Sequence, residues 1–498
     1  MPIILIISDR QQDWALKILT TVFGVSNMAK GRRSKKKGEI STPNPTSPKT
    51  STKTLVDGEL GKPASEPFFS RVDWLTGLIV LLISLIVYLY TLAPDVTLED
   101  SGELAVGSMY AGVPHPPGYP MWTIYSWFFT KILPFSNIAW RVAVSSAVAA
   151  ALSSGLLALM VSRGSNLTLS SISQFKGMSS KHIQMLCIAA GMSSGLIFAF
   201  NGFIWSQAVI VEVYTLSFLT FTLTLTFLMR WFFRPKERLY LYLAYFSFGL
   251  CFVNHQTLIL GAVGIEILIL LADQKLGRDF LTGNCSLYIV GLALSLKGAG
   301  DASTGNPGLF VLFNFVGSLL MATLITITIK LPRPELKLLA GGAYFAVALC
   351  FGLLWDSALG KQQFAQANTT VKLWAFLNLV ILLALIAHSW INRNKDDDDE
   401  GLLTNWMALL NTRAAWVAAA LLYFYMPIAS MTNPPMNWAY PRTLQGFKHA
   451  ITRGQYDRIM PSNLTRMFID HSHIENLQQT KSNGFNGGQL GVYIDEAR

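Results

Sequence analysis

Long hydrophobic runs recur along this chain between residues 74 and 430, and most are close to 20 residues long. A helix of about 20 residues crosses the roughly 30 Å hydrocarbon core of a bilayer. We therefore predict an all-α polytopic membrane protein with about eleven transmembrane helices. The predicted spans are 74–93, 139–161, 184–202, 207–232, 239–254, 257–272, a weak one at 286–298, 309–329, 336–355, 373–391 and 414–430.

Short basic patches between the runs predict the topology, because Lys and Arg favour cytoplasmic loops. Residues 1–70 carry a basic, Ser/Thr/Pro-rich stretch that predicts a disordered cytoplasmic tail, with Met28 as the expected true start. If successive spans cross the membrane in alternating directions, starting from a cytoplasmic N-terminus, each clear basic cluster lies on the cytoplasmic side. Residues 71–430 then form the membrane domain, and the acidic loop after the first span and residues 431–498 lie outside.

The composition supports this class and excludes others. The chain is 51% hydrophobic and 14% charged, whereas soluble domains carry about a quarter charged residues. The net charge of +10 is spread over the short loop patches, so it indicates topology and no nucleic-acid partner. The four cysteines stand singly, which fits neither a disulfide framework nor a zinc site.

Three carboxylates, Glu99, Asp100 and Glu103, follow the first predicted span directly. An acidic cluster where lipid meets water suits an enzyme that acts on a lipid-linked substrate better than a channel lining. Asp-x-x-Glu ahead of an apolar run is also a helix-start pattern, in which each side chain caps the other's backbone N–H. In the catalytic interpretation, the like charges raise one pKa, as a general base requires.

The loop Pro114–Pro120 holds four prolines in seven residues and is expected to be ordered and extended. His115 within it is a candidate to bind a phosphate or to orient a carboxylate. Tyr119 and the nearby aromatic residues are candidates to stack on a sugar ring. The alternatives are a structural turn with an exposed histidine and an aromatic belt at the membrane interface.

Glu212 is expected about two helical turns below the outer end of the span 207–232, followed by Tyr214. An ionisable residue at that depth is costly and marks a candidate site, although a structural hydrogen bond is the alternative. Asn254 and His255 interrupt an apolar run at the same predicted face, as a site or as a simple turn. After the last span, Trp438 and Arg442 suit a pocket for a sugar and a phosphate, or belong to an ordinary loop.

Several of these motifs together resemble one family. They are Glu-Asp-Ser-Gly-Glu-Leu (99–104), His-Pro-Pro-Gly-Tyr-Pro (115–120), Ile-Ala-Trp-Arg-Val (138–142), Trp-Ser-Gln-Ala-Val-Ile-Val-Glu-Val-Tyr (205–214) and Asn-His-Gln (254–256). They resemble the membrane family that includes the animal transmembrane protein 260, a family of protein O-mannosyltransferases with many bacterial members. The resemblance covers roughly residues 70–275, and the segment from Thr432 is similar to the bacterial branch. Bacterial relatives look longer, so this chain is expected to be truncated.

The resemblance implies a GT-C glycosyltransferase fold with an extracytoplasmic catalytic loop, in which the acid at Asp100 or Glu103 acts at the sugar carbon. It implies a polyprenyl-phosphate sugar donor, an exported protein as acceptor, contact with membrane lipid, and a place in a bacterial inner membrane. The expected reaction transfers a hexose, with mannose as the expected sugar, to a Ser or Thr hydroxyl. The cofactor is open: no metal-ligand motif stands out, and the carboxylates leave room for a divalent metal. The alternative function is a secondary transporter with Glu212 as its ion site.

Overall fold

The computed structural model describes residues 67–97, 99–172, 175, 177–295, 307–360, 364–391 and 401–453. Within these ranges the regular structure is helical, apart from an isolated β-bridge between Val113 and Asn437. The predicted all-α class is therefore confirmed. Residues 1–66, which make up nearly all of the predicted tail and include Met28, lie outside the described residues, and so does the chain after Arg453.

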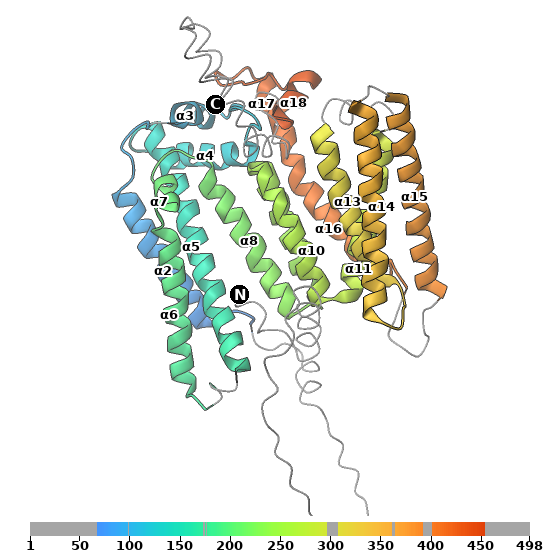
Figure 1. The fold of residues 1–498 in the computed structure, drawn as a ribbon. Coiled ribbons are helices and arrows are strands. Elements are labelled where there is room, and N and C mark those ends of the chain that lie inside the picture. The colour runs from blue at the N-terminus through green and yellow to red at the C-terminus, as the bar shows by residue number, and fades with distance from the viewer. Residues whose placement is uncertain are drawn as a thin grey trace, which may run out of the picture. The chain divides into compact units, whose positions relative to one another are not determined.

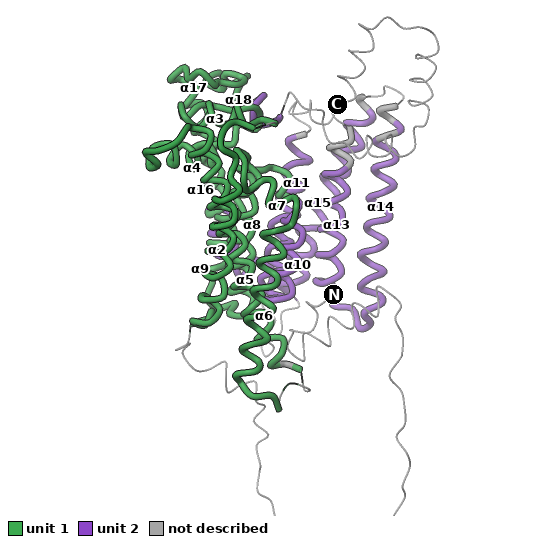
Figure 2. Tube along the Cα trace, turned by 90° about the vertical axis from the view of Figure 1, so that its left-hand side faces the viewer, with its two compact units in different colours: residues 1–259, 415–447 green, residues 260–414, 448–498 purple. Residues whose placement is uncertain are grey.

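The chain separates into two compact units, which Figure 2 shows in different colours. Unit 1 comprises residues 1–259 and 415–447, and unit 2 comprises residues 260–414 and 448–498. All predicted site residues belong to unit 1. The division into a tail, a membrane domain and an outer segment remains a prediction.

Among the described helices, seven are long and apolar enough to cross a membrane. They are Arg71–Tyr90, Ile138–Ser170, Ser180–Ala199, Tyr214–Phe233, Pro334–Trp355, Gln366–Ile391 and Trp406–Met431. The predicted spans at 239–254, 257–272 and 286–298 fall on helices that are too short or too polar to meet this criterion. The predicted span at 309–329 falls on an apolar helix, of which Leu312–Thr328 counts toward this criterion. An integral membrane protein is supported, and the predicted number of eleven spans is not confirmed.

Unit 1 is built around the helix α5 (Ile138–Ser171), which packs against α2 (Arg71–Tyr90) and α6 (Ser180–Ala199). Small residues permit this packing: a methyl group on Gly77 of α2 would lie only 2.8 Å from the Gly155 carbonyl oxygen of α5. Such close backbone approach is typical of helices that associate within a membrane. The other long helices of the unit are α8 (Tyr214–Phe233) and α9 (Arg238–Asn254).

Short helices gather at one end of unit 1 (Figure 1). The chain between α2 and α5 forms α3 (Ser101–Met109) and α4 (Pro120–Ile132), which lie across the ends of the long helices. The connection from α6 to α8 forms α7 (Gly202–Ala208), and η3 (Gln256–Leu260) follows α9. The returning chain adds the last part of α16 (Trp406–Ala420), then η4 (Leu421–Phe424) and α17 (Tyr425–Met431). The candidate site is built from these connections.

Unit 2 contains the helices α10 (Gly261–Ala272), α11 (Gln274–Ser295), α13 (Pro307–Thr328), α14 (Pro334–Gly360) and α15 (Phe364–Ile391). The short helix α18 (Leu444–Ile451) crosses the boundary between the units. A neutral polar network lies in the core of unit 2. The Trp374 indole donates to the Tyr288 hydroxyl at 2.7 Å, and the Tyr344 hydroxyl donates to Asn378 Oδ1 at 2.5 Å.

Candidate functional site

Asp100 occupies the N-cap position of α3, but its side chain makes no capping hydrogen bond. The predicted reciprocal capping box is therefore absent. The Asp100 side chain is 56% exposed, and its Oδ2 lies 3.8 Å from His115 Nε2. Glu99 precedes it in the left-handed region, with φ 64°, and is exposed. A non-glycine residue in this region costs of order 1–3 kcal/mol, and such strain concentrates at functional sites.

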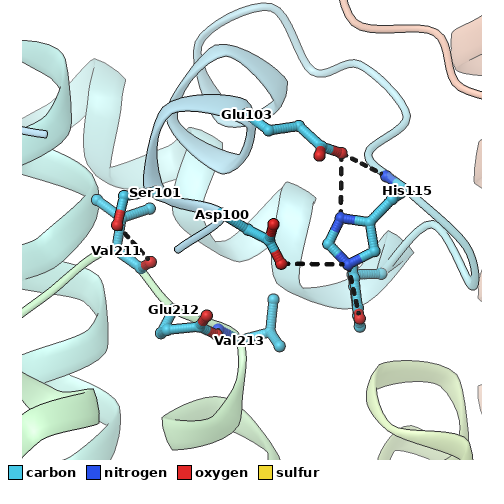
Figure 3. A network of polar contacts seen from close by, with 8 residues as sticks. Asp100, Ser101, Glu103, His115, Val211, Glu212 and Val213 are labelled. Atoms are coloured by element: carbon cyan, nitrogen blue, oxygen red, sulfur yellow. Dashed lines mark hydrogen bonds and ion pairs between the residues drawn. The ribbon is translucent and has the colours of Figure 1, made fainter. Parts of the chain in front are cut away.

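Glu103 turns toward the proline loop and not toward its own helix start (Figure 3). Its Oε1 accepts a hydrogen bond from the His115 backbone N–H at 2.6 Å and lies 3.1 Å from His115 Nδ1. The Glu103 side chain is only 17% exposed. One carboxylate therefore holds both the backbone and the ring of His115.

His115 is buried, with 7% of its surface exposed, so the predicted alternative of an exposed loop histidine is wrong. Its Nε2 lies 3.1 Å from the Tyr119 hydroxyl, and the two rings meet edge to face. Burial lowers the pKa of His115, but the hydrogen bond to Glu103 and the charges of Glu103, Asp100 and Glu212 outweigh it, and the pKa is raised above its ordinary 6.5. The ring can carry a positive charge between two carboxylates.

The loop that carries His115 ends in a sharp turn, whereas its prolines predict an extended loop. The Gly118 N–H donates to the His115 carbonyl at 2.8 Å, and Gly118 and Tyr119 both adopt positive φ, 83° and 38°. Pro120 follows as the first residue of α4, where its missing N–H costs nothing. Tyr119 is 7% exposed, so it supports His115 and offers no open face for a sugar ring.

Glu212 lies in a break between α7 and α8, at residues 209–213, and not inside a span. The predicted continuous helix over 207–232 is therefore wrong, because α8 begins only at Tyr214. The break directs Glu212 toward the same place as Asp100 (Figure 3). The transporter alternative depended on a carboxylate two turns deep within a helix, and this placement removes that support.

Side chains from neighbouring helices hold the break in place. The Trp122 indole of α4 donates to the Glu212 carbonyl at 3.0 Å, and the Ser146 hydroxyl of α5 donates to the same oxygen at 3.2 Å. Asn254, at the end of α9, donates to the Val213 carbonyl at 3.1 Å. The carbonyls that the helix break leaves free are thus paired inside the protein, as a low-dielectric setting requires.

The Glu212 side chain is buried, and its Oε2 accepts from the Val213 N–H at 2.7 Å. Burial raises the pKa of Glu212 to about 7, the Val213 hydrogen bond lowers it, and the charges of Glu99 and Asp100 raise it further. Glu212 can therefore hold a proton near neutral pH while Asp100 stands open to solvent. Two acids in such different settings suit different roles.

The remaining predicted residues lie around this centre. The Tyr214 ring is 5.5 Å from the His255 ring, and His255 Nδ1 lies 2.6 Å from the Thr257 hydroxyl. Asn254 is fully buried, and its Nδ2 donates to the Val213 carbonyl and to the Ser217 hydroxyl, which makes it a support of the helix break. Arg442 is exposed, binds Asn433 Oδ1, and makes no recorded contact with the carboxylates.

Backbone hydrogen bonds place Trp438 beside the loop that carries His115. Its N–H donates to the Val113 carbonyl at 2.9 Å, and the Val113 N–H donates to the Met436 carbonyl at 2.8 Å. The Tyr425 hydroxyl also donates to the Gly112 carbonyl, at 3.2 Å. The segment after α17 is thus fixed on the loop that carries His115, although some 320 residues separate them in sequence.

Asp100, Glu103 and His115 each offer one ligand atom, and these atoms lie within 4.8 Å of one another. Carboxylate oxygens and an imidazole nitrogen at this spacing can hold a divalent cation. Without a cation, His115 is still hydrogen-bonded to Glu103, while Asp100 lies 3.8 Å from the ring, beyond hydrogen-bonding distance. The sequence pointed to each of these residues, but it did not pair Glu103 with His115.

The sequence interpretation missed the supporting roles of Trp122 and Ser146 in the site. Ser146 left a signal, since it is a polar residue inside an apolar run. Trp122 carries no such mark: it was assigned to stacking or an interface belt, yet it is fully buried and spends its N–H on the Glu212 backbone. Pairing across 90 residues cannot be deduced from one sequence.

The fold and the site together define a helical integral membrane protein with a carboxylate–histidine centre at one end of its first unit. Residues 100–277 match the family model described as the N-terminal domain of protein O-mannosyl-transferase TMEM260. The matched residues contain Asp100, Glu103, His115, Glu212 and Asn254. Residues 100–277 of this chain are therefore similar to the N-terminal domain of the TMEM260 family.

Two relatives agree with this assignment. Protein O-mannosyl-transferase tmem260 of Dictyostelium discoideum is 28% identical over 212 residues, which cover 39% of this chain and 23% of that protein. Protein O-mannosyl-transferase TMEM260 of Mus musculus is 28% identical over 209 residues, which cover 41% of this chain and 27% of that protein. The aligned stretch thus spans about a quarter of the relatives' length. No solved structure matches the chain.

Proposed function

We propose that this protein transfers a hexose, with mannose as the expected sugar, from a polyprenyl-phosphate donor to a Ser or Thr hydroxyl of an exported protein. The relatives' name, protein O-mannosyl-transferase, supplies the reaction class. The observation that carries the proposal is the convergence of Asp100, Glu103 and His115 on one point. The activity of the whole chain is part of the proposal, because only its N-terminal domain is matched.

Asp100 is the proposed general base. Its carboxylate makes no cap bond and is more than half exposed, so its oxygens can reach an incoming hydroxyl. The acceptor hydroxyl gives its proton to Asp100, and its oxygen forms a bond to the anomeric carbon of the sugar. The bond from that carbon to the phosphate oxygen breaks, and the lipid phosphate leaves with the electron pair.

His115 and Glu103 are proposed to balance charge during this step. A protonated His115 lies between Asp100 and Glu103 and places a positive charge where a leaving phosphate would gather negative charge. If a divalent cation binds, the same three side chains would hold it, and it would stabilise the leaving phosphate as a Lewis acid. Chelation followed by addition of Mg²⁺ or Mn²⁺ decides between these two sources of positive charge.

We propose that the site faces the extracytoplasmic side. Glu212 precedes the start of α8, and the basic residues Arg230 and Arg234 lie at its other end. A helix of 20 residues separates these ends by about 30 Å, the thickness of a bilayer core. Because basic residues favour the cytoplasm, the carboxylates would lie outside, in keeping with a bacterial inner-membrane enzyme that modifies exported proteins.

The experiment is glycan mass analysis of exported proteins from cells with the gene, without it, and with the Asp100→Asn variant in its place. We expect O-linked hexose on a set of exported proteins only when the wild-type gene is present. Unchanged glycans in all three strains would contradict the proposal.

A further inference from the structure

The segment after α17, Asn433–Tyr440, lines an open pocket of about 380 Å³ in unit 1. Pockets that bind ligands measure roughly 300–1,000 Å³. Its lining consists of two asparagines, two prolines, one methionine and two aromatic residues, all from this segment. None of the lining side chains carries a charge, although the Arg442 guanidinium contacts two of them, Asn433 and Tyr440. The lining itself therefore suits a neutral occupant.

The backbone beside this pocket has an open edge. Val113 pairs with Met436 and Trp438 on either side of Asn437, so in this parallel bridge the N–H and C=O of Asn437 point away from Val113. Among the described residues neither group has a hydrogen-bond partner, and the buried Asn437 Oδ1 has none either. Unpaired strand groups of this kind accept a further extended chain.

This edge lies close to the carboxylate–histidine centre. Val113 is two residues before His115, a separation of about 7 Å along an extended chain. Met436 packs on the loop directly, because a Cβ placed on Gly112 would overlap the Met436 carbonyl oxygen. Met436 also lies beside Gly107, one turn beyond Glu103 in α3. The open edge of Asn437 faces away from Val113, so a chain bound there would lie on the far side of residues 436–438, roughly 10 Å from the strand that leads to His115.

We infer that Asn433–Tyr440 is the acceptor site and that it takes an extended polypeptide by strand addition at Asn437. Only a polypeptide repeats N–H and C=O groups at strand spacing, whereas a sugar or a lipid does not. One acceptor side chain would enter the pocket near Trp438, and a neighbouring Ser or Thr would be presented to the carboxylates. The inference rests on the proposed function and specifies how its protein substrate is held.

The test measures binding of a fluorescent, uncharged peptide, a central threonine flanked by valines, to the full chain in detergent. Two N-methylated forms of this peptide each block the amides of one strand edge. We expect methylation of one edge to weaken binding at least about tenfold, and methylation of the other edge to leave it within about twofold. Because the protein is wild type in this arm, misfolding cannot explain a loss.

Variants supply the second arm. Asn437→Pro removes the N–H and should weaken binding about tenfold, whereas Asn437→Ala keeps the N–H and should weaken it less. Trp406→Ala removes an exposed tryptophan outside the pocket lining and is the control. Equal effects of both methylated peptides, or displacement of the peptide by free mannose, would overturn the inference. Edge-selective binding with no sugar transfer would instead overturn the proposed function and leave the polypeptide site standing.

Discussion

Two polar clusters of this protein differ in what their side chains can do. In unit 2, Tyr288, Trp374, Tyr344 and Asn378 pair donor with acceptor, and all four are neutral. In unit 1, Asp100, Glu103 and His115 are ionisable, and one of them remains open to solvent. A satisfied neutral network locks helices together, whereas an ionisable cluster with an open oxygen keeps reactivity. The cluster in unit 2 therefore stabilises the fold, whereas the cluster in unit 1 is the candidate for catalysis.

The largest expected loss of activity follows a substitution at Asp100. Asp100→Asn keeps the shape of the side chain but cannot take a proton, so we expect the transfer rate to fall by about 10²–10⁴. Asp95→Asn, a change at another exposed carboxylate of the same loop, should retain near-normal transfer. Initial rates with purified protein decide the matter. Equal rates for Asp100→Asn and wild type would remove Asp100 from the site.

Glu212 tests whether a buried acid belongs to the reactive cluster. Its native pKa of about 7 exceeds its ordinary 4.5, so the native state keeps a proton that the unfolded chain releases. Stability should fall as pH rises through this window, by about 3 kcal/mol for this group. Glu212→Gln should remove this contribution. Unfolding midpoints at pH 5 and pH 8 would show the variant less pH-sensitive than wild type; equal sensitivity would contradict the assignment.

A substitution at Glu103 tests whether Asp100 and Glu103 have different roles. Glu103→Gln leaves an oxygen to accept from the His115 N–H but removes the charge beside the ring, so we expect the rate to fall by about 10–100-fold, less than for Asp100→Asn. Its pH profile should also shift, because His115 loses the partner that raises its pKa. If Glu103→Gln were slower than Asp100→Asn, Glu103 and not Asp100 would be the general base.

Tyr344 tests the other side of the comparison and should give the smallest effect. Tyr344→Phe removes the hydrogen bond to Asn378 within unit 2, which should cost about 0.6–1.7 kcal/mol of stability. Transfer per folded molecule should stay within about twofold, because a supporting network has no role in the reaction. A large loss of rate without loss of stability would mean that unit 2 also takes part in catalysis.

Much of the site could be predicted from the sequence because its residues are close together in the chain. Asp100, Glu103 and His115 lie within 16 residues. The prolines in the sequence also predict directly that the loop is ordered. The helix break at Glu212 could not be predicted. Apart from Glu212 its residues are apolar and continue a hydrophobic pattern. The break is held by Trp122 and Ser146 from distant helices. Tertiary hydrogen bonds overrode the local pattern there.

The predicted number of eleven spans is not confirmed, and the bounds of one predicted span differ from those of its helix. Hydropathy predicts a span wherever about 20 apolar residues follow one another, but it does not see where a helix ends. The chain from 207 to 213 reads as part of a span and forms α7 and an irregular segment instead. The docking of residues 436–438 on Val113 likewise follows from backbone hydrogen bonds, which leave no mark in a single sequence.

The central claim is that Asp100 activates a hydroxyl for sugar transfer. The most direct measurement incubates purified full-length chain with polyprenyl-phosphate mannose and a threonine peptide, and follows the peptide by mass spectrometry. Our account predicts one added hexose on the threonine with wild-type protein and none above background with Asp100→Asn. Equal hexose addition by both proteins would contradict it. So would the absence of hexose addition by the wild-type protein both after chelation and after addition of a divalent metal.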